Sequence, residues 1–179
     1  NCMNEYKLGE VAGIRLSIQP LAIPGSLLML IVLSGVGTGI LNWPVGEALL
    51  ASLVAVILHW VSEIAHQLGH AWSARQTGYP MMGIRLGKWG VLSTSLYPPA
   101  EPTLPSAVHI RRALGGPALS LLLTVVLIIA VLAFRSVGGT LWWVGVFVLL
   151  DHIMVFTLGA LLPLGFTDGS TLLEWWGKP

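Results

Sequence analysis

The sequence predicts an all-α membrane protein with about four transmembrane helices and small strands on its cytoplasmic surface. Only 9% of its 179 residues are charged and its mean hydropathy is +0.81, whereas about a quarter of a soluble domain is charged. Four apolar runs reach the ~20 residues that a helix needs to cross a bilayer. The lipid bilayer is therefore the first predicted partner, and the net charge of +1 gives no reason to expect nucleic acid.

The elements follow from local patterns within one membrane-embedded domain, residues 1–179. An N-terminal surface segment, 1–20, contains an alternating stretch at 11–18 that favours one short strand. Glycine and proline are frequent in 78–106, which predicts a surface strand or hairpin followed by a proline-rich loop. The predicted transmembrane helices cover residues 21–41, 44–72, 113–134 and 141–164.

Basic residues are unequally distributed across these spans. A chain with four spans has both termini and the connection between the second and third spans on one side of the membrane. Eight of the nine Lys and Arg residues lie in these segments. The other side has only Arg135. By the positive-inside rule, both termini are predicted to be cytoplasmic. The eight residues are Lys7, Arg15, Arg75, Arg85, Lys88, Arg111, Arg112 and Lys178.

The second span carries a candidate metal site. His66 and His70 are four residues apart, so both lie on one helical face and can bind one zinc ion. The string His66-Gln67-Leu68-Gly69-His70 matches the H-E-x-x-H signature except at its glutamate, which is the general base toward the water that zinc activates. Asp168, just beyond the fourth span, is the best candidate for a third ligand.

Four motifs in order give the chain a resemblance to the site-2 protease family of intramembrane zinc metalloproteases. The resemblance covers nearly the whole chain, and it implies a site-2-protease-like core with one zinc ion held by His66, His70 and Asp168. The motifs are H-Q-L-G-H-A at 66–71 with Arg75, Gly78 and Pro80 after it, a strand-like stretch at 83–87, G-G-P-A-L-S at 115–120, and A-L-L-P-L-G-F-T-D-G at 160–169.

Two positions depart from the family pattern in ways that affect catalysis. Gln67 occupies the general-base position, and a carboxamide has no useful basicity. Ala160 occupies the position of an asparagine that the resemblance assigns to holding substrate or transition-state oxygen. Losing a general acid–base group typically costs ~10²–10⁴-fold in rate, and losing an oxyanion donor ~10²–10³-fold. Little or no peptidase activity is expected.

Further polar residues lie within the spans, where each is costly and needs a partner. Glu63 shares a helical face with the two histidines. We expect it to accept a hydrogen bond from a liganding imidazole or to serve as a helix-packing partner, rather than to replace the missing base. His59 is interpreted as a polar contact between helices. The Asp151-His152 pair is expected to reach toward the second span. The single cysteine, Cys2, is interpreted as an ordinary thiol rather than a lipidation site.

Three functions follow from this pattern. The first is a zinc-binding pseudoenzyme that holds a membrane segment, the transmembrane helix of a partner or substrate, or serves as a subunit of a larger membrane complex. The second is a genuine intramembrane protease, a hydrolase of transmembrane substrates, in which Gln67 is an engineered inactivating substitution; Ala160 counts against it. The third is a pigment- or haem-associated scaffold, because histidines within spans can ligate such cofactors.

Overall fold

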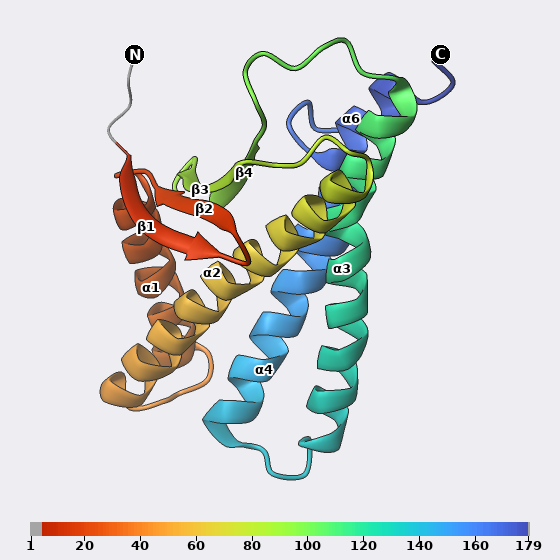
Figure 1. Ribbon diagram of the computed structural model, residues 1–179. Coiled ribbons are helices and arrows are strands. Elements are labelled where there is room, and N and C mark those ends of the chain that lie inside the picture. Colours follow the sequence, from red (N-terminus) through yellow and green to blue (C-terminus); the bar gives the residue numbers. More distant parts are fainter. Residues whose placement is uncertain (1–4, 179) are drawn as a thin grey trace.

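The computed structural model describes residues 5–178, so Cys2 lies outside the described residues. It combines four long apolar helices with one small sheet, which confirms the predicted fold class (Figure 1). The helices long and apolar enough to cross a membrane are α1 (Ala22–Gly39), α2 (Val45–Gln76), α3 (Ser106–Ala133) and a composite fourth span over Gly139–Leu161. The fourth span comprises α4 (Gly139–Asp151), a π-helical turn η1 (His152–Thr157) and the short α5 (Leu158–Leu161), and α6 (Asp168–Trp175) follows it.

Helix ends differ from the predicted boundaries where the helices extend beyond their apolar zone. The third helix begins at Ser106 rather than 113, because Pro105 precedes it with extended geometry and the polar first turns pack against neighbouring elements. The second continues to Gln76 rather than ending at 72. Hydropathy identifies the part of a helix that suits lipid, whereas backbone hydrogen bonding continues into polar sequence.

The N-terminal segment forms a hairpin instead of the single strand that we expected over 11–18. Strands β1 (Tyr6–Val11) and β2 (Ile14–Ile18) pair antiparallel, and the turn between them lies at Ala12 and Gly13 with φ of 52° and 76°. Positive φ at both central residues is typical of a two-residue hairpin turn, and glycine adopts it readily. The alternation in the sequence therefore concealed a turn.

The hairpin joins a second one to form a four-stranded sheet. Strands β3 (Gly83–Lys88) and β4 (Leu92–Leu96) pair antiparallel, and β2 pairs with β3 in parallel, which gives the order β1-β2-β3-β4. The sheet packs on the C-terminal half of α2 through a buried apolar cluster. Its members are Ile14, Leu16, Ala71, Ala74, Met81, Ile84 and Leu86.

Helix α2 crosses the molecule between α1 on one side and α3 and α4 on the other (Figure 1). Two glycines let it approach α3 closely. A Cβ atom added to Gly69 would lie 2.9 Å from the Cβ of Leu119 and 3.0 Å from the carbonyl carbon of Gly115. Small residues of this kind let membrane helices pack backbone to backbone. This contact brings the histidine face of α2 against α3.

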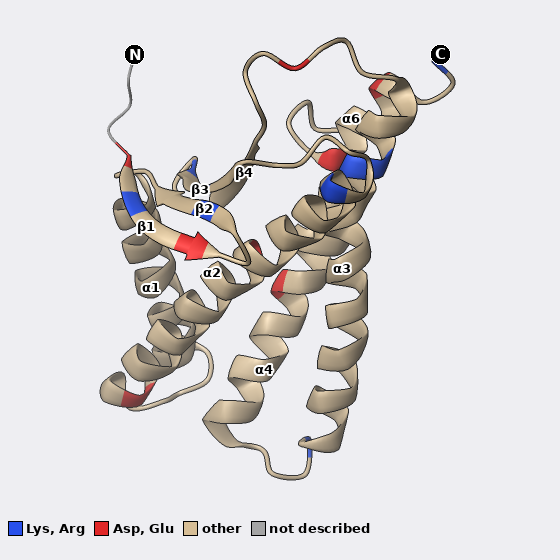
Figure 2. Ribbon diagram, in the orientation of Figure 1, with Lys and Arg blue, Asp and Glu red and all other residues tan. Residues whose placement is uncertain are grey.

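Charged residues gather at one end of the molecule. The N- and C-terminal ends of the described chain lie at the same end (Figure 1), and most Lys and Arg residues lie toward it (Figure 2). The connection between α3 and α4, which contains Arg135, lies at the opposite end (Figure 2). This arrangement matches the unequal charge distribution from which the cytoplasmic side was predicted.

Candidate metal centre

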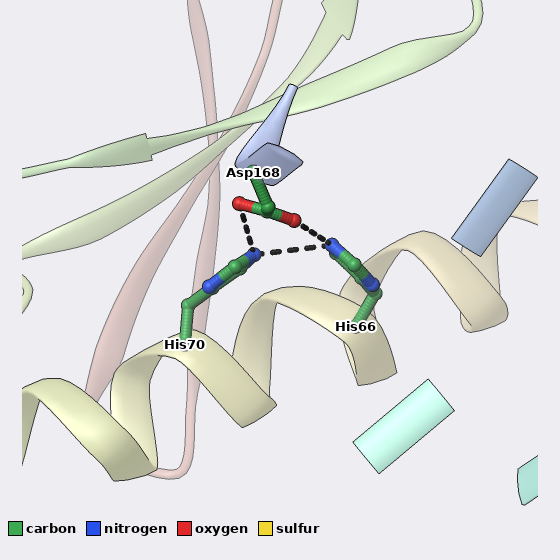
Figure 3. A group of neighbouring side chains, drawn as sticks. All are labelled: His66, His70 and Asp168. Atoms are coloured by element: carbon green, nitrogen blue, oxygen red, sulfur yellow. Dashed lines mark hydrogen bonds and ion pairs between the residues drawn. The ribbon is translucent and has the colours of Figure 1, made fainter. Parts of the chain in front are cut away.

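The structure brings His66, His70 and Asp168 together (Figure 3). The two histidines project from successive turns of α2, with their Nε2 atoms 3.1 Å apart and their rings nearly perpendicular. Asp168 is the first residue of α6, and its two carboxylate oxygens face different histidines: Oδ2 lies 3.3 Å from Nε2 of His66 and Oδ1 lies 3.3 Å from Nε2 of His70. Both imidazoles are buried, so the three donor atoms meet inside the protein.

Asp168 is positioned by the way the chain turns after the fourth span. Leu162 is extended and ends α5, and the chain then returns through a short loop to begin α6. Gly169 lies so close to the backbone of Leu161 that no side chain could be accommodated there. At the far end of α6, Trp175 stacks on His109 of α3 at a centroid distance of 4.1 Å. The helix is therefore fixed at both ends with its N-terminal carboxylate toward the histidines.

Each imidazole is oriented through its second nitrogen. The Nδ1 atom of His66 lies 2.9 Å from the Oγ atom of Ser120, and Nδ1 of His70 lies 2.7 Å from the carbonyl oxygen of Arg112. The backbone N–H of Gly116 is also 3.2 Å from Nδ1 of His70, but the shorter contact to a carbonyl requires a proton on Nδ1. In the neutral ring the lone pair is then on Nε2, the atom that faces Asp168.

Of the two roles expected for Glu63, the structure shows a packing contact and no hydrogen bond to a histidine. Its carboxylate accepts a hydrogen bond from the Ser93 hydroxyl of β4 and none from His66 or His70. The shared helical face was identified correctly, but the sheet lies over that face and supplies a closer partner. Ser120 and the Arg112 carbonyl take the orienting role instead. A main-chain carbonyl has no sequence signature, so the second of these could not be predicted.

The donor set fits a zinc ion. Two ligands at about 2.0–2.1 Å from a tetrahedral zinc lie roughly 3.3–3.4 Å apart. The two Nε2 atoms here are 3.1 Å apart, and each lies 3.3 Å from a different oxygen of Asp168; one donor atom from each residue lies within 4.8 Å of the other two. Gly116 of α3 keeps the space between the imidazoles open. A Cβ atom at Gly116 would lie 2.6 Å from Nε2 of His66. Two imidazoles and a carboxylate with an open side are typical of catalytic zinc sites.

The charge state of Asp168 also suits a ligand. Burial alone would raise the pKa of this carboxyl, but hydrogen bonds from His66 and His70 in their protonated forms outweigh it and lower the pKa to about 2. Asp168 is therefore ionised at neutral pH, which is the form that coordinates metal ions.

Both degenerate positions line the same cavity as the triad. This cavity has a volume of about 600 Å³ and is bounded by α2, β4 and the end of the fourth span. Gln67 is buried on its α2 wall, and its Oε1 atom accepts a hydrogen bond of 2.6 Å from Ser95. Ala160 is buried on the α5 wall. Glu63 lines the cavity as well, so a carboxylate is present one helical turn from Gln67.

A second polar cluster connects the fourth span to α2. Nδ1 of His59 lies 2.9 Å from the carboxylate of Asp151, and its Nε2 lies 2.8 Å from the carbonyl oxygen of Val91. This confirms that His59 is a contact between helices and that Asp151 reaches the second span. The Nδ1 atom of His152 lies 3.2 Å from the carbonyl oxygen of Val148 in its own span. The π-helical turn beginning at His152 places Phe156 between the rings of His59 and His66.

Helix α2 carries two histidines one turn apart, an aspartate beyond the last span completes the group, and a small sheet packs against the same helix. No family model and no curated protein matches the chain. Among solved structures it is similar to the site-2 protease from Methanocaldococcus jannaschii, with 22% sequence identity and a TM-score of 0.64. The match covers 96% of this chain and 70% of that one. The likeness shows that the chain has a site-2 protease fold.

Proposed function

We propose that this chain is a zinc-binding membrane protein of the site-2 protease type that does not hydrolyse peptides and instead holds a membrane segment of another protein. The observation that carries the proposal is that one cavity contains three candidate metal ligands but lacks a general base. Donor atoms of His66, His70 and Asp168 lie within 4.8 Å of one another, and the position beside His66 holds Gln67. This arrangement keeps three potential metal ligands, whereas the group that would move protons is absent.

His66, His70 and Asp168 would hold the ion, and zinc bound there would polarise a carbonyl and acidify water. The residues around it do not supply the remaining catalytic steps. Gln67 cannot accept a proton from water or return one to a leaving amine. Ala160 has no hydrogen-bond donor for a developing oxyanion. Each loss alone is expected to cost two to four orders of magnitude in rate.

Glu63 does not restore the missing base in this proposal. Its carboxylate is held by Ser93 on β4, one turn of α2 before Gln67. One turn is about 5.4 Å along the helix axis, which is too far for a group that must contact the attacking water directly. We therefore assign Glu63 to the contact between α2 and the sheet.

The proposed setting is a multi-pass protein in the bilayer with both termini on the cytoplasmic side. The proposed partner is a transmembrane segment, either alone or as part of a larger membrane complex. Its supporting feature is the cavity, which contains apolar side chains such as Met154, Phe156 and Phe166 beside the polar triad. Such a mixed lining suits a chain that is apolar overall and exposes some backbone polar groups.

The test combines metal content with a cleavage assay on a membrane-spanning reporter. The purified protein should contain about one zinc per chain, and the His66→Ala variant should contain none. The wild-type protein should not cleave the reporter. The variants Gln67→Glu and Gln67→Glu with Ala160→Asn measure how much activity each lost group accounts for, and the double variant should exceed the single one.

Two results would contradict the proposal. The metal site would be excluded if the wild type and His66→Ala contained the same small amount of zinc. The pseudoenzyme role would be excluded if the wild type cleaved the reporter at a rate that Gln67→Glu did not increase.

A further inference from the structure

The turn between β3 and β4 holds a tryptophan in an unfavourable backbone conformation. Strand β3 ends at Lys88, β4 begins at Leu92, and Trp89 is the first residue between them. Its φ of 51° lies in the left-handed region, which bulky residues rarely adopt, yet the residue is 58% exposed. Burial in a core therefore does not account for it. Backbone strain of this kind is concentrated at functional sites, so the exposed indole needs an explanation other than packing.

The turn lies at the depth where two of the spans end. A Cβ atom added to Gly90 would lie 3.3 Å from the carbonyl oxygen of Leu21, the residue that precedes α1. On the other side, the Trp89 ring packs edge to face on Phe166 at a centroid distance of 4.2 Å, and Phe166 follows the end of the fourth span at Leu161 by five residues. Both contacts place the turn at one boundary of the apolar zone, on the side proposed to be cytoplasmic. Tryptophan is enriched at such boundaries.

Lys88 supplies a positive charge between the two aromatic rings. Its Nζ atom lies 5.0 Å from the centroid of the Trp89 ring and 5.6 Å from that of Phe166. Within residues 5–178 this ammonium forms no ion pair, and the Trp89 indole N–H donates no hydrogen bond. Both groups are hydrogen-bond donors. A ligand at this boundary therefore meets free donors and a positive charge.

The carboxylates of the adjoining cavity do not neutralise Lys88. Lys88 lines the cavity that contains the candidate metal centre, and three acidic residues line it too. Asp168 faces the two histidines, Glu101 accepts hydrogen bonds from the guanidinium on α3, and Glu63 accepts one from a serine of β4. None of the three lies within the 4.0 Å of an ion pair with Lys88. Its charge is open to a ligand from outside the described chain.

We propose that Lys88, with Trp89 and Phe166 beside it, binds the phosphate group of an anionic membrane phospholipid. At this depth the bilayer itself supplies phosphates, and lysine side chains extend their ammonium toward that layer. The surface around the site is apolar, since Leu162 and Leu164 are 52% and 56% exposed. The acyl chains of the same lipid can therefore pack beside the bound phosphate, whereas a free inorganic phosphate would make only the polar contacts.

This inference rests on the proposed setting in the bilayer, but it requires neither zinc nor a bound membrane segment. The experiment is native mass spectrometry of the full chain released from a neutral detergent, after titration with dioleoylphosphatidylglycerol or dioleoylphosphatidylcholine. The two lipids share their acyl chains and their phosphate, but the choline of the second carries a positive charge that opposes Lys88. The fraction of chain that carries a lipid gives an apparent Kd for each.

We expect the wild type to bind phosphatidylglycerol more tightly than phosphatidylcholine. Lys88→Gln should bind phosphatidylglycerol about 5-fold more weakly, the effect of one basic residue at an anionic membrane surface, and Lys88→Arg should bind it as the wild type does. Lys178→Gln is the matched control, because that ammonium also lies over a tryptophan, 5.3 Å from the Trp175 ring, but does not line the cavity. Its affinity for phosphatidylglycerol should be unchanged.

A Trp89→Asn variant separates lipid binding from folding. Asparagine tolerates the left-handed backbone better than tryptophan, which offsets the ring contacts that are lost. The affinity for phosphatidylglycerol should therefore fall while the unfolding midpoint does not. A lower midpoint with unchanged affinity would overturn the proposal, because Trp89 would then serve only the packing of the turn.

The proposal is also overturned if Lys88→Gln binds phosphatidylglycerol as tightly as the wild type, if the two lipids bind equally, or if millimolar inorganic phosphate displaces the lipid. Zinc is measured on the same samples. The His66→Ala variant should lose zinc and keep the lipid, and Lys88→Gln should keep zinc. The metal centre and the lipid site can therefore fail independently.

Discussion

Substituting alanine for Gly116 tests whether the space between the two imidazoles is a metal site. The Cβ atom of an alanine there would lie 2.6 Å from Nε2 of His66 and 2.6 Å from Cε1 of His70. Non-bonded carbon atoms prefer about 3.5–4.0 Å, so relief of the contact needs a movement of about 1 Å. The substitution therefore acts on the donor atoms without removing any of them.

The expected effect is a loss of zinc affinity of more than about 100-fold. Metal ligands must lie within about 0.2 Å of their ordinary distances, and a 1 Å displacement of one imidazole exceeds that tolerance severalfold. Disturbing only the groups that orient metal ligands costs about 10–100-fold, so displacing a ligand should cost more. Alanine has a higher helix propensity than glycine, so local loss of α3 is not the expected cause.

The assay is zinc competition against a chromophoric chelator, with thermal unfolding in the same detergent as a folding control. Gly145→Ala is the matched control, because its added Cβ would lie 3.6 Å from the nearest atom of Val131, an ordinary contact. We expect Gly145→Ala to retain about one zinc per chain and Gly116→Ala to retain almost none. If folded Gly116→Ala held zinc as tightly as the wild type, then His66 and His70 would not bind metal through their facing nitrogens.

Other variants test the contacts around the site. Asp151→Ala should destabilise the fold by about 3–5 kcal/mol, because it leaves buried His59 without its partner, and a double His59→Leu, Asp151→Leu variant should recover much of the thermal stability. Hydrogen bonding to Arg112 lowers the pKa of Glu101. The stabilisation that this ion pair gives to the folded state is therefore present above pH 4.5, the ordinary pKa, and is lost as the pH falls below it. The unfolding midpoint of Glu101→Gln should thus approach that of the wild type at low pH. Gly69→Ala should lower the unfolding midpoint, because its Cβ would contact the backbone of α3, and an unchanged midpoint would refute the close packing of α2 and α3.

The sequence predicts best those features that depend on one element alone. The number of spans follows from hydropathy. The position of His66 and His70 on one face of a helix follows from helical periodicity. Identifying Asp168 as the third candidate ligand depended on the order of the motifs, because this residue lies on a different helix about a hundred residues later in the chain. The structure places all three donors within 4.8 Å of one another.

Features that depend on two elements meeting were not predictable in this way. The helical face of Glu63 left open a hydrogen bond to a histidine or a packing contact, and only the structure shows that β4 lies over that face and that Ser93 donates a hydrogen bond to Glu63. Gly116 was noticed only as part of a motif, and its role is to leave space between two side chains of another helix. The π-helical turn has no sequence signal that we recognised, although it places Phe156 between two histidines of α2.

The parallel pairing of β2 with β3 has a consequence for the order in which the protein assembles. Strand β2 precedes α1 and strand β3 follows α2, so the two strands are separated in the chain by both helices. The backbone bonds between them can form only after the ribosome has delivered α1 and α2 and the pair has folded back on itself. A chain with either helix inserted the wrong way round would leave the two strands at different levels. The parallel pair β2–β3 can therefore form only in chains whose first two helices are inserted so that both strands reach the same side.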